Sequence, residues 1–569
     1  MRLAAALFAL VLGCEGQILG EGGSPPDSSG LGGGGGVPGS GGAFPMNGPS
    51  DDELRARDPA LFDIALSYFP GQSAAPGKTR LFRLTRAQLD ATTESLLPGH
   101  GAASTLESLP RDPLQTNYEY AESLGFSAAN FTPLTQWVAA LSASVGRSPS
   151  LVIDCSAGGS SNACLEERAR AFVERAFRGV VSDASLERFA KFYSASVTQV
   201  GFAQATADLV DVTLTSPGYL FRDEVQTDER GRLLPAQLLQ NLSYTLADAP
   251  PEAVGLSTPA RGDGALADTE LARAIDTVLT TPAARDKLLR FFSSWLEVKE
   301  PNELDISTEV YPDFTPEVAA AIVADTRRFL AKQLALPAPT LRDVTESVSA
   351  IVSGPSAFLY GVDGKSGEVS LDPAQRLGIF SQPAVIASHS GPTTTRLVKR
   401  GVFFTRKVMC LPLGVPPADV NTTLPEDVEG TERERIEGVT RPARCAGCHD
   451  FINPFGFMQE SYDAVGRFRS HDGDRPVDPS ISVDFLDEGP LTAGTTVEAL
   501  RAITRSLRFQ QCFTRQLFRF YLGRDEAAGD DPLLRQLFFE FAQHDSQNIV
   551  TMLRSLASAH AFHARAGTP

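Results

Sequence analysis

The sequence predicts a mainly α protein, a multidomain helical body with short β accessories. Apolar residues recur at three- and four-residue steps through most of the chain after residue 58, which is the period of an amphipathic helix. The sequence has no long run of alternating apolar and polar residues, so no major sheet is expected. About 510 residues follow a Gly-rich N-terminal region, which is enough chain for two to four domains with separate cores.

The first helix signal is a capping box. Thr85 and Gln88 stand three residues apart just before the apolar Leu89, a pattern with which many helices begin. A helix rich in Arg and Glu follows at 165–177, and another begins at Leu186. The same periodicity predicts helices at 203–215, 235–247, 268–280, 283–297, 315–334, 372–388, 396–410, 509–517, 533–541 and 547–562.

Three segments depart from the helical pattern. Gly, Asp and Pro punctuate residues 355–371 and 470–490, where short hairpins are expected. Residues 411–444 are polar, rich in Pro at their start and without clear periodicity. An extended loop is therefore predicted there, leading into the most specific motif of the chain.

That motif is Cys445-Ala446-Gly447-Cys448-His449. Two thiols one helical turn apart can form thioethers with the two vinyl groups of one porphyrin, and the adjacent imidazole can then bind the iron. The pattern predicts a cytochrome c-like segment in which Cys445 and Cys448 attach haem c and His449 is the metal ligand. The second axial ligand is open between His389, Met458 and Met409, with an iron that has no second protein ligand as the remaining possibility.

Residues 1–14 predict a lipoprotein signal peptide. Arg2 supplies a positive start, Leu3 to Leu12 form an apolar stretch too short for a mature transmembrane helix, and the sequence before Cys14 resembles a bacterial lipobox. Cys14 is then the lipidation site, and an ordinary signal peptide with an incidental Cys is the alternative. Residues 15–57 are rich in Gly, Ser and Pro and predict an unstructured tether.

Charge and cysteine content agree with an extracytoplasmic protein. The net charge of −18 argues against nucleic acid as a partner. Cys155 and Cys164 bracket a short Gly/Ser loop that suits a local disulfide, and Cys410 and Cys512 flank the motif and predict a second one. Buried free thiols are the alternative for the second pair.

Several segments resemble one family. Residues 453–460 (NPFGFMQE) and 462–469 (YDAVGRFR) follow the motif, and residues 216–224 read SPGYLFRDE. Further similar segments are Asn241 to Tyr244, Trp295-Leu296, Arg400 to Cys410 and Cys512 to Arg524. In this order they resemble the large secreted proteins of planctomycetes and myxobacteria that are built from planctomycete-type domains of unknown function. The resemblance spans about residues 80–565 and implies a multidomain, helical, cytochrome-like surface protein.

The chain departs from that family at Asn453, where Asp is usual, and a carboxylate near the expected haem is thereby lost. A charged set follows the motif: Glu460, Asp463, Arg467 and Arg469. The arginines could pair with haem propionates, because a guanidinium binds a carboxylate through two hydrogen bonds. The preferred interpretation is that the four residues cap helices and fix a loop.

The predicted organisation has seven parts. They are a signal peptide (1–14), a tether (15–57), an N-terminal helical domain (58–150), two further helical domains (151–225 and 226–385), a CxxCH cytochrome-like domain (386–475) and a C-terminal helical domain (476–569).

The leading hypothesis is a lipoprotein held in the bacterial cell envelope through Cys14, in the outer membrane or the periplasm. It would carry one covalent c-type haem as the electron-transfer or redox module of an extracytoplasmic oxidoreductase system, with a redox partner protein that the sequence does not identify. A haem peroxidase is a third option, favoured if the iron has no second protein ligand. The alternative is a surface scaffold or binding protein for a partner or polysaccharide, in which the Cys pair is structural.

Overall fold

A computed structural model describes residues 48–74, 77–100, 109–115, 118–119, 121–155, 161–257, 266–414, 429–485, 488–543 and 547–565. The predicted signal peptide, Cys14 and residues 15–47 of the predicted tether lie outside these ranges. The described body is mainly helical with short two-stranded sheets, so the predicted fold class is confirmed. Within the described residues, no helix has both the length and the hydropathy to cross a membrane.

The first helix of the described residues lies inside the predicted tether, and the second follows it. Helix α2 (Asp51–Arg57) begins with a capping box between Ser50 and Glu53 and buries Leu54. Helix α3 (Pro59–Tyr68) follows, and both pack against α22 (Asp531–Gln543). The tether prediction was therefore wrong for residues 51–57, because the capping box and one buried leucine order this mostly charged segment.

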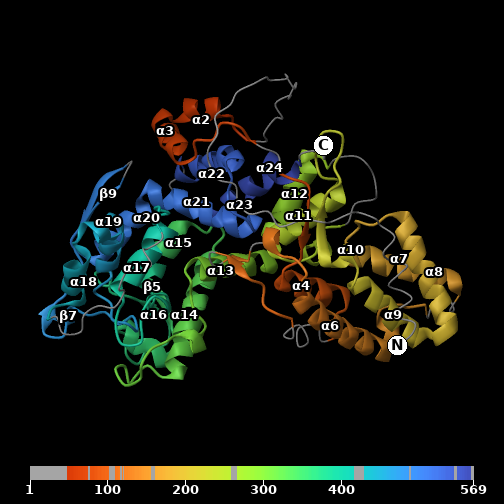
Figure 1. Ribbon diagram of the computed structural model, residues 1–569, viewed down its shortest axis with the longest axis horizontal. Helices are drawn as coiled ribbons and strands as arrows, with labels where there is room; N and C mark the ends of the chain where they lie inside the picture. The colour runs from red at the N-terminus through yellow and green to blue at the C-terminus, as the bar shows by residue number, and fades with distance from the viewer. Residues whose placement is uncertain are drawn as a thin grey trace. The chain divides into compact units, whose positions relative to one another are not determined.

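One helical core occupies the region from β1 to β4. The capping box at Thr85 and Gln88 starts α4, as predicted. The helices of this region are α4 (Arg86–Leu96), α6 (Ala128–Arg147), α7 (Asn162–Ala176), α8 (Asp183–Val200), α9 (Phe202–Leu214) and α10 (Pro217–Leu220), and Figure 1 shows them grouped together. Their apolar faces form a shared core, and the predicted boundary at 150/151 lies within it.

This region also holds short strands and 3-10 turns. Strand β1 (Arg80–Arg83) pairs antiparallel with β4 (Phe221–Glu224), although about 140 residues separate them in sequence. The remaining short elements are β2 (Leu114–Gln115), β3 (Tyr118–Glu119), η1 (Ala121–Ser123) and η2 (Pro149–Leu151).

The largest core joins the middle of the chain to its C-terminus. It gathers buried side chains from α3, α11 (Pro235–Ala247), α12 (Asp268–Leu279), α13 (Pro282–Trp295), α20 (Thr496–Arg505), α21 (Leu507–Leu522), α22 and α23 (Ile549–Ser558). The short elements η3 (Pro251–Val254), η4 (Pro301–Glu303), η8 (Ala528–Asp530) and α24 (His560–His563) connect or end these helices. Trp295 stacks parallel to Phe291 at its centre, and neither ring has exposed surface.

A third core lies under α14 (Pro316–Leu334). It includes η5 (Gly354–Tyr360) and the hairpin of β5 (Ser349–Val352) with β6 (Gly367–Ser370). Helix α15 (Leu341–Thr345) follows α14 and contributes its buried leucine and valine to the largest core. Two more hairpins pair β7 (His471–Asp472) with β8 (Arg475–Pro476) and β9 (Ile481–Phe485) with β10 (Gly489–Ala493). Hairpins were predicted at 355–371, a segment that includes β6, and at 470–490, where the other two begin.

The segment that carries the motif is built on four helical elements. They are α16 (Pro383–Ser388), α17 (Leu397–Phe403) with its π-helical continuation η7 (Phe404–Val408), α18 (Glu432–Thr440) and α19 (Ala443–Phe457). Helix α19 packs on α17, on η7 and on α18, and in Figure 1 these helices lie beside β7 and β9.

Two predicted elements differ from the structure. The predicted helix 372–388 is reduced to η6 (Ile379–Ser381) and α16, because Gly378 adopts a positive φ and its backbone lies against Thr345. The predicted loop 411–444 contains α18, which starts with a capping box between Thr431 and Glu434. Residues 415–428 of that loop lie outside the described residues.

Candidate functional site

Both cysteines of the motif lie on the first turns of α19. Cys445 and Cys448 are three residues apart, so a continuous helix places their side chains on one face. Neither forms a disulfide; Cys445 is half-buried and Cys448 is exposed. The same helix is exposed over most of residues 443–450, and its buried residues are Ile452, Phe455, Gly456 and Phe457, so the thiols occupy its outer half.

The inner half of α19 is held tightly against α17. A Cβ at Gly401 would lie 2.2 Å from the carbonyl oxygen of Ile452, and one at Gly456 would lie 2.2 Å from that of Leu397. Only glycine permits this backbone approach. The Thr405 hydroxyl adds a hydrogen bond of 3.1 Å to the carbonyl of Phe451.

His449 directly follows the second thiol and is half-buried. Its Nδ1 lies 2.7 Å from Oδ1 of Asn453, one helical turn further along α19. Asn453 Nδ2 in turn donates to the Thr440 hydroxyl of α18 at 2.9 Å. Asn453, noted in the sequence only as a missing carboxylate, is thus the direct partner of the motif's imidazole.

His389, a candidate second ligand, lies in the core of the protein. It is 4% exposed, and its Nε2–H donates to the carbonyl of Leu296 at 3.0 Å. Its ring stacks on Phe403 with 4.0 Å between centroids. Burial lowers the pKa of His389 to about 3, so the ring stays neutral inside the protein. His389 is therefore held in the core through one ring nitrogen and the ring face, and its role as a haem ligand stays a prediction.

Met458 and Met409 are core residues with no exposed surface. Met458 caps α19 nine residues after His449. Nine residues further along an α-helix, a side chain points to about the opposite face and lies about 13 Å further along the helix axis. Two ligands of one iron must lie within a few Å of each other. Met458 therefore cannot reach an iron that His449 binds, which corrects that prediction.

The charged residues after the motif are all engaged, some within their own loop and some with distant segments of the chain. Glu460 is fully buried and accepts from the backbone N–H groups of Arg433 and Asp478; burial raises its pKa above the ordinary value. Arg469 donates to the Glu460 carbonyl and to Asp472. These contacts support the loop-fixing interpretation over propionate binding.

The other two charged residues behave in the same way. Asp463 accepts from the backbone N–H groups of Val465 and Arg467 and so closes a turn. The Arg467 side chain lies 3.8 Å from the carboxylate of Asp313.

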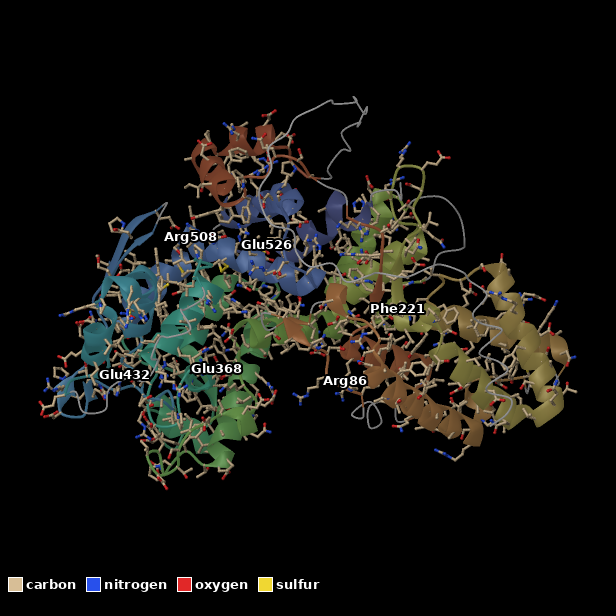
Figure 2. The ribbon with its side chains drawn as sticks, viewed as in Figure 1. Arg86, Phe221, Glu368, Glu432, Arg508 and Glu526 are labelled. Atoms are coloured by element: carbon tan, nitrogen blue, oxygen red, sulfur yellow. A yellow bond between two sulfur atoms is a disulfide. The ribbon has the colours of Figure 1, made fainter. Side chains whose placement is uncertain are left out.

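Two residues that fix the site were missed in the sequence. Arg400 is 1% exposed and donates to the carbonyls of Gln459, Tyr462 and Asp463, so one guanidinium holds the chain that leaves α19. Glu432 of α18, labelled in Figure 2, accepts from the backbone N–H of Leu397 at 2.8 Å and so joins α18 to the start of α17. A single Arg in a predicted helix, or a single Glu in a polar stretch, gives no sign of such a role.

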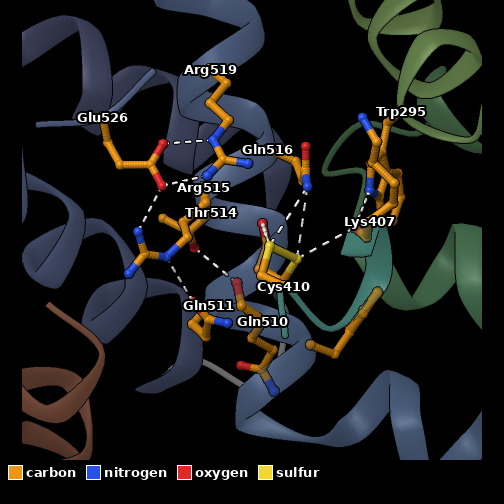
Figure 3. The surroundings of a disulfide bond; sticks show 12 residues. Trp295, Lys407, Cys410, Gln510, Gln511, Thr514, Arg515, Gln516, Arg519 and Glu526 are labelled. Atoms are coloured by element: carbon orange, nitrogen blue, oxygen red, sulfur yellow. Dashed lines mark hydrogen bonds and ion pairs between the residues drawn. A yellow bond between two sulfur atoms is a disulfide. The ribbon is translucent and has the colours of Figure 1, made fainter. Parts of the chain in front are cut away.

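Both predicted disulfides are present. Cys410, after η7, is joined to Cys512 of α21, and Cys155 is joined to Cys164 of α7. Figure 3 shows the first bond beside Lys407, whose carbonyl accepts from the Trp295 indole at 2.8 Å. Two disulfides are typical of an oxidising, extracytoplasmic compartment.

Four family models match successive parts of the chain. Their descriptions are Protein of unknown function (DUF1595) over residues 164–224, (DUF1592) over 233–362, (DUF1588) over 376–472 and (DUF1585) over 493–562. The DUF1588 match contains Cys445, Cys448 and His449. No curated protein and no solved structure matches the chain. The chain therefore carries several domains of unknown function, and the resemblance found in the sequence is confirmed at that level.

Proposed function

We propose that this multidomain chain is an envelope-anchored lipoprotein that carries one covalent c-type haem and acts as the electron-transfer or redox module of an extracytoplasmic oxidoreductase system. The observation that carries the proposal is the arrangement on α19: two unpaired thiols three residues apart, followed by an imidazole with one ring nitrogen already fixed. The matched families are associated with cytochrome c-like proteins, which supports a redox role.

The donor set fits a c-type haem. Cys445 and Cys448 would hold the porphyrin as thioethers, and His449 would bind the iron through Nε2, because Nδ1 is engaged by Asn453. The bound group would supply a one-electron redox couple. The exposed outer half of α19 lets a partner protein reach the motif without rearrangement of the buried inner half.

The second axial position distinguishes a simple carrier from an enzyme. His389, Met409 and Met458 are each buried and engaged elsewhere in the structure. We therefore expect an iron to which none of these three residues binds, and a high-spin spectrum if no other ligand replaces them. Such a site favours the redox-enzyme form of the proposal over a six-coordinate carrier.

The anchoring part of the proposal rests on the sequence before residue 48 and on the two disulfides. Lipid on Cys14 would hold the body at a membrane surface through a Gly-rich segment. Metabolic labelling with a fatty acid, compared between the wild-type chain and Cys14→Ser, tests the anchor separately from the haem.

The haem is tested by co-expressing the chain with the cytochrome c maturation machinery and recording a pyridine haemochrome spectrum. We expect a c-type α-band that survives acid-acetone extraction, is lost in Cys445→Ala/Cys448→Ala and is kept in the control Ala446→Ser, which lies in the same turn. The absence of covalent haem in the wild-type chain would overturn the proposal.

One observation favours the second candidate, a surface scaffold or binding protein. Cys448 lies on an exposed helix face and Cys445 is only half-buried, whereas a porphyrin is commonly enclosed by protein. In this case the haemochrome spectrum would stay empty, and the Cys445→Ala/Cys448→Ala variant would be less stable than the wild-type chain, because the Cys pair is structural in this candidate.

A further inference from the structure

The inference concerns a chain of hydrogen bonds that ends at His449. Thr440, 9% exposed near the end of α18, donates its hydroxyl proton to the carbonyl of Ile436 at 2.7 Å. A threonine hydroxyl has one proton, so towards any other neighbour its oxygen can only accept. That neighbour is the Asn453 amide nitrogen at 2.9 Å, which must therefore be the donor.

This contact decides which way the Asn453 amide faces. With Nδ2 directed to Thr440, the carbonyl oxygen Oδ1 faces His449 Nδ1 at 2.7 Å. A carbonyl oxygen cannot donate, so Nδ1 must carry the proton. In the neutral imidazole the remaining nitrogen, Nε2, then has the lone pair that a metal requires.

We propose that Asn453 is a positioning residue, which together with Thr440 sets the tautomer and the ring orientation of His449 and presents Nε2 as the ligand atom. A ligating histidine commonly donates its other ring N–H to an acceptor that fixes its orientation. The assignment of iron as the metal rests on the proposed function; the tautomer is a property of the protein before any cofactor is bound.

The hydrogen-bond chain from Thr440 through Asn453 to His449 joins two helices, so both helices fix its geometry. His449 and Asn453 are four residues apart on α19, where helical spacing brings side chains together. Thr440 belongs to α18, which is joined to α17 by the contact of Glu432 with the Leu397 amide. The orientation of the imidazole is therefore set by the packing of α18 on α19 and not by α19 alone.

Whether the partner of His449 is an amide or a carboxylate should affect the reduction potential of a bound haem. A neutral amide oxygen is a weaker acceptor than a carboxylate, so it transfers less electron density to the imidazole. With Asp in place of Asn453 the ligand would be more basic and would stabilise the oxidised iron. The Asn453→Asp holoprotein should therefore have a lower reduction potential than the wild type.

The test is a measurement on the full-length chain without haem. Long-range proton–nitrogen NMR of histidine-labelled protein, at a pH well above the ordinary histidine range, reports which ring nitrogen is protonated. The NMR signal that disappears in His449→Gln is the one that belongs to His449. We expect His449 to carry its proton on Nδ1, with a preference of about tenfold, the ratio that one hydrogen bond of ordinary strength supports.

The variants then separate positioning from general folding. Asn453→Ala and Thr440→Val should lose the Nδ1–H preference, whereas Thr440→Ser, which keeps the hydroxyl, and Asn453→Asp, which keeps an acceptor, should retain it. A wild-type ring protonated on Nε2, or an unchanged preference in Asn453→Ala, would overturn the inference. Haem attachment is measured separately. A protein with this tautomer but without covalent haem would therefore reject the proposed function and still support the role of Asn453 and Thr440.

Discussion

Gly401 of α17 and Gly456 of α19 face each other across the contact between the two helices. A Cβ built on Gly401 would lie 3.1 Å from the backbone nitrogen of Gly456, and one on Gly456 would lie 3.5 Å from that of Gly401. Each would also lie 2.2 Å from a carbonyl oxygen of the opposite helix. The helix that carries the two thiols is therefore positioned by close backbone contact at these two glycines, with the Ile452 side chain beside the contact.

Substituting either glycine should separate the two helices. Gly456→Ala and Gly401→Ala place a methyl group against a backbone carbonyl that cannot rotate away, so we expect each to lower the free energy of unfolding by about 1–3 kcal/mol or more. Urea denaturation measures this loss. In the control Gly438→Ala of α18, the new Cβ would meet nothing within 4 Å. Alanine is the better helix former, so that variant should be unchanged or up to about 1 kcal/mol more stable. Equal losses in all three variants would contradict the backbone-contact argument.

The two disulfides should contribute unequally to stability. The bond between Cys410 and Cys512 closes a loop with a sequence separation of 102, and that between Cys155 and Cys164 one of 9. Loop-closure entropy gives a stabilisation of about 5 kcal/mol for the long loop and about 3 kcal/mol for the short one. Replacing each pair by serine and measuring urea denaturation under non-reducing conditions compares them. A larger loss for the Cys155/Cys164 variant would contradict the entropic ordering.

Stability should fall in mild acid because of His389. Its pKa is about 3 in the folded protein, mainly through burial, against an ordinary value of 6.5. Below about pH 6.5 the unfolded chain takes up a proton that the folded protein refuses, and this favours unfolding. The contribution is up to about 1.4 kcal/mol per pH unit between these two values.

His389→Gln removes this titration and retains an amide that can donate to the Leu296 carbonyl. We expect the variant to be less stable than the wild type at neutral pH, with a smaller loss on going from about pH 6.5 to pH 4.5. The exposed His471→Gln is the control and should keep the wild-type slope. An identical slope in His389→Gln and the wild type would show that other groups cause the acid sensitivity.

The N-terminal helices are held by an ion pair with a buried arginine. Arg535 of α22 has no exposed surface and donates to both carboxylate oxygens of Asp51, at 3.0 and 2.6 Å. Asp51→Asn leaves this guanidinium without its counter-charge. Because the Asp51 side chain is 43% exposed, solvent screens part of the effect, and we expect a loss of about 1 kcal/mol. Asp52→Asn, in the same exposed first turn, should change the urea midpoint little.

Local sequence patterns predicted most helices well because their causes are local. Helix α11 begins at Pro235 and ends at Ala247, the bounds that the periodicity predicted, since proline suits a first helical turn. The helix predicted at 372–388 does not form over its first half, because Gly378 has a positive φ and its backbone lies against Thr345. The local sequence does not show this contact. Helix α18 was missed because it is polar and buries few side chains, so its apolar period is weak. The pairing of β1 with β4 joins distant segments and leaves no local pattern.

The sequence by itself determined the motif of the candidate site. Cys445, Cys448 and His449 are neighbours on one helix, and helical geometry alone places their side chains within reach of a single group. The tertiary structure decided the rest. The burial of His389 and Met458, the Gly401–Gly456 contact and the hydrogen bond from Asn453 to Thr440 all arise from how separate helices pack. The orientation of a side chain towards a neighbouring helix depends on the crossing of the two helices, which no short stretch of sequence encodes.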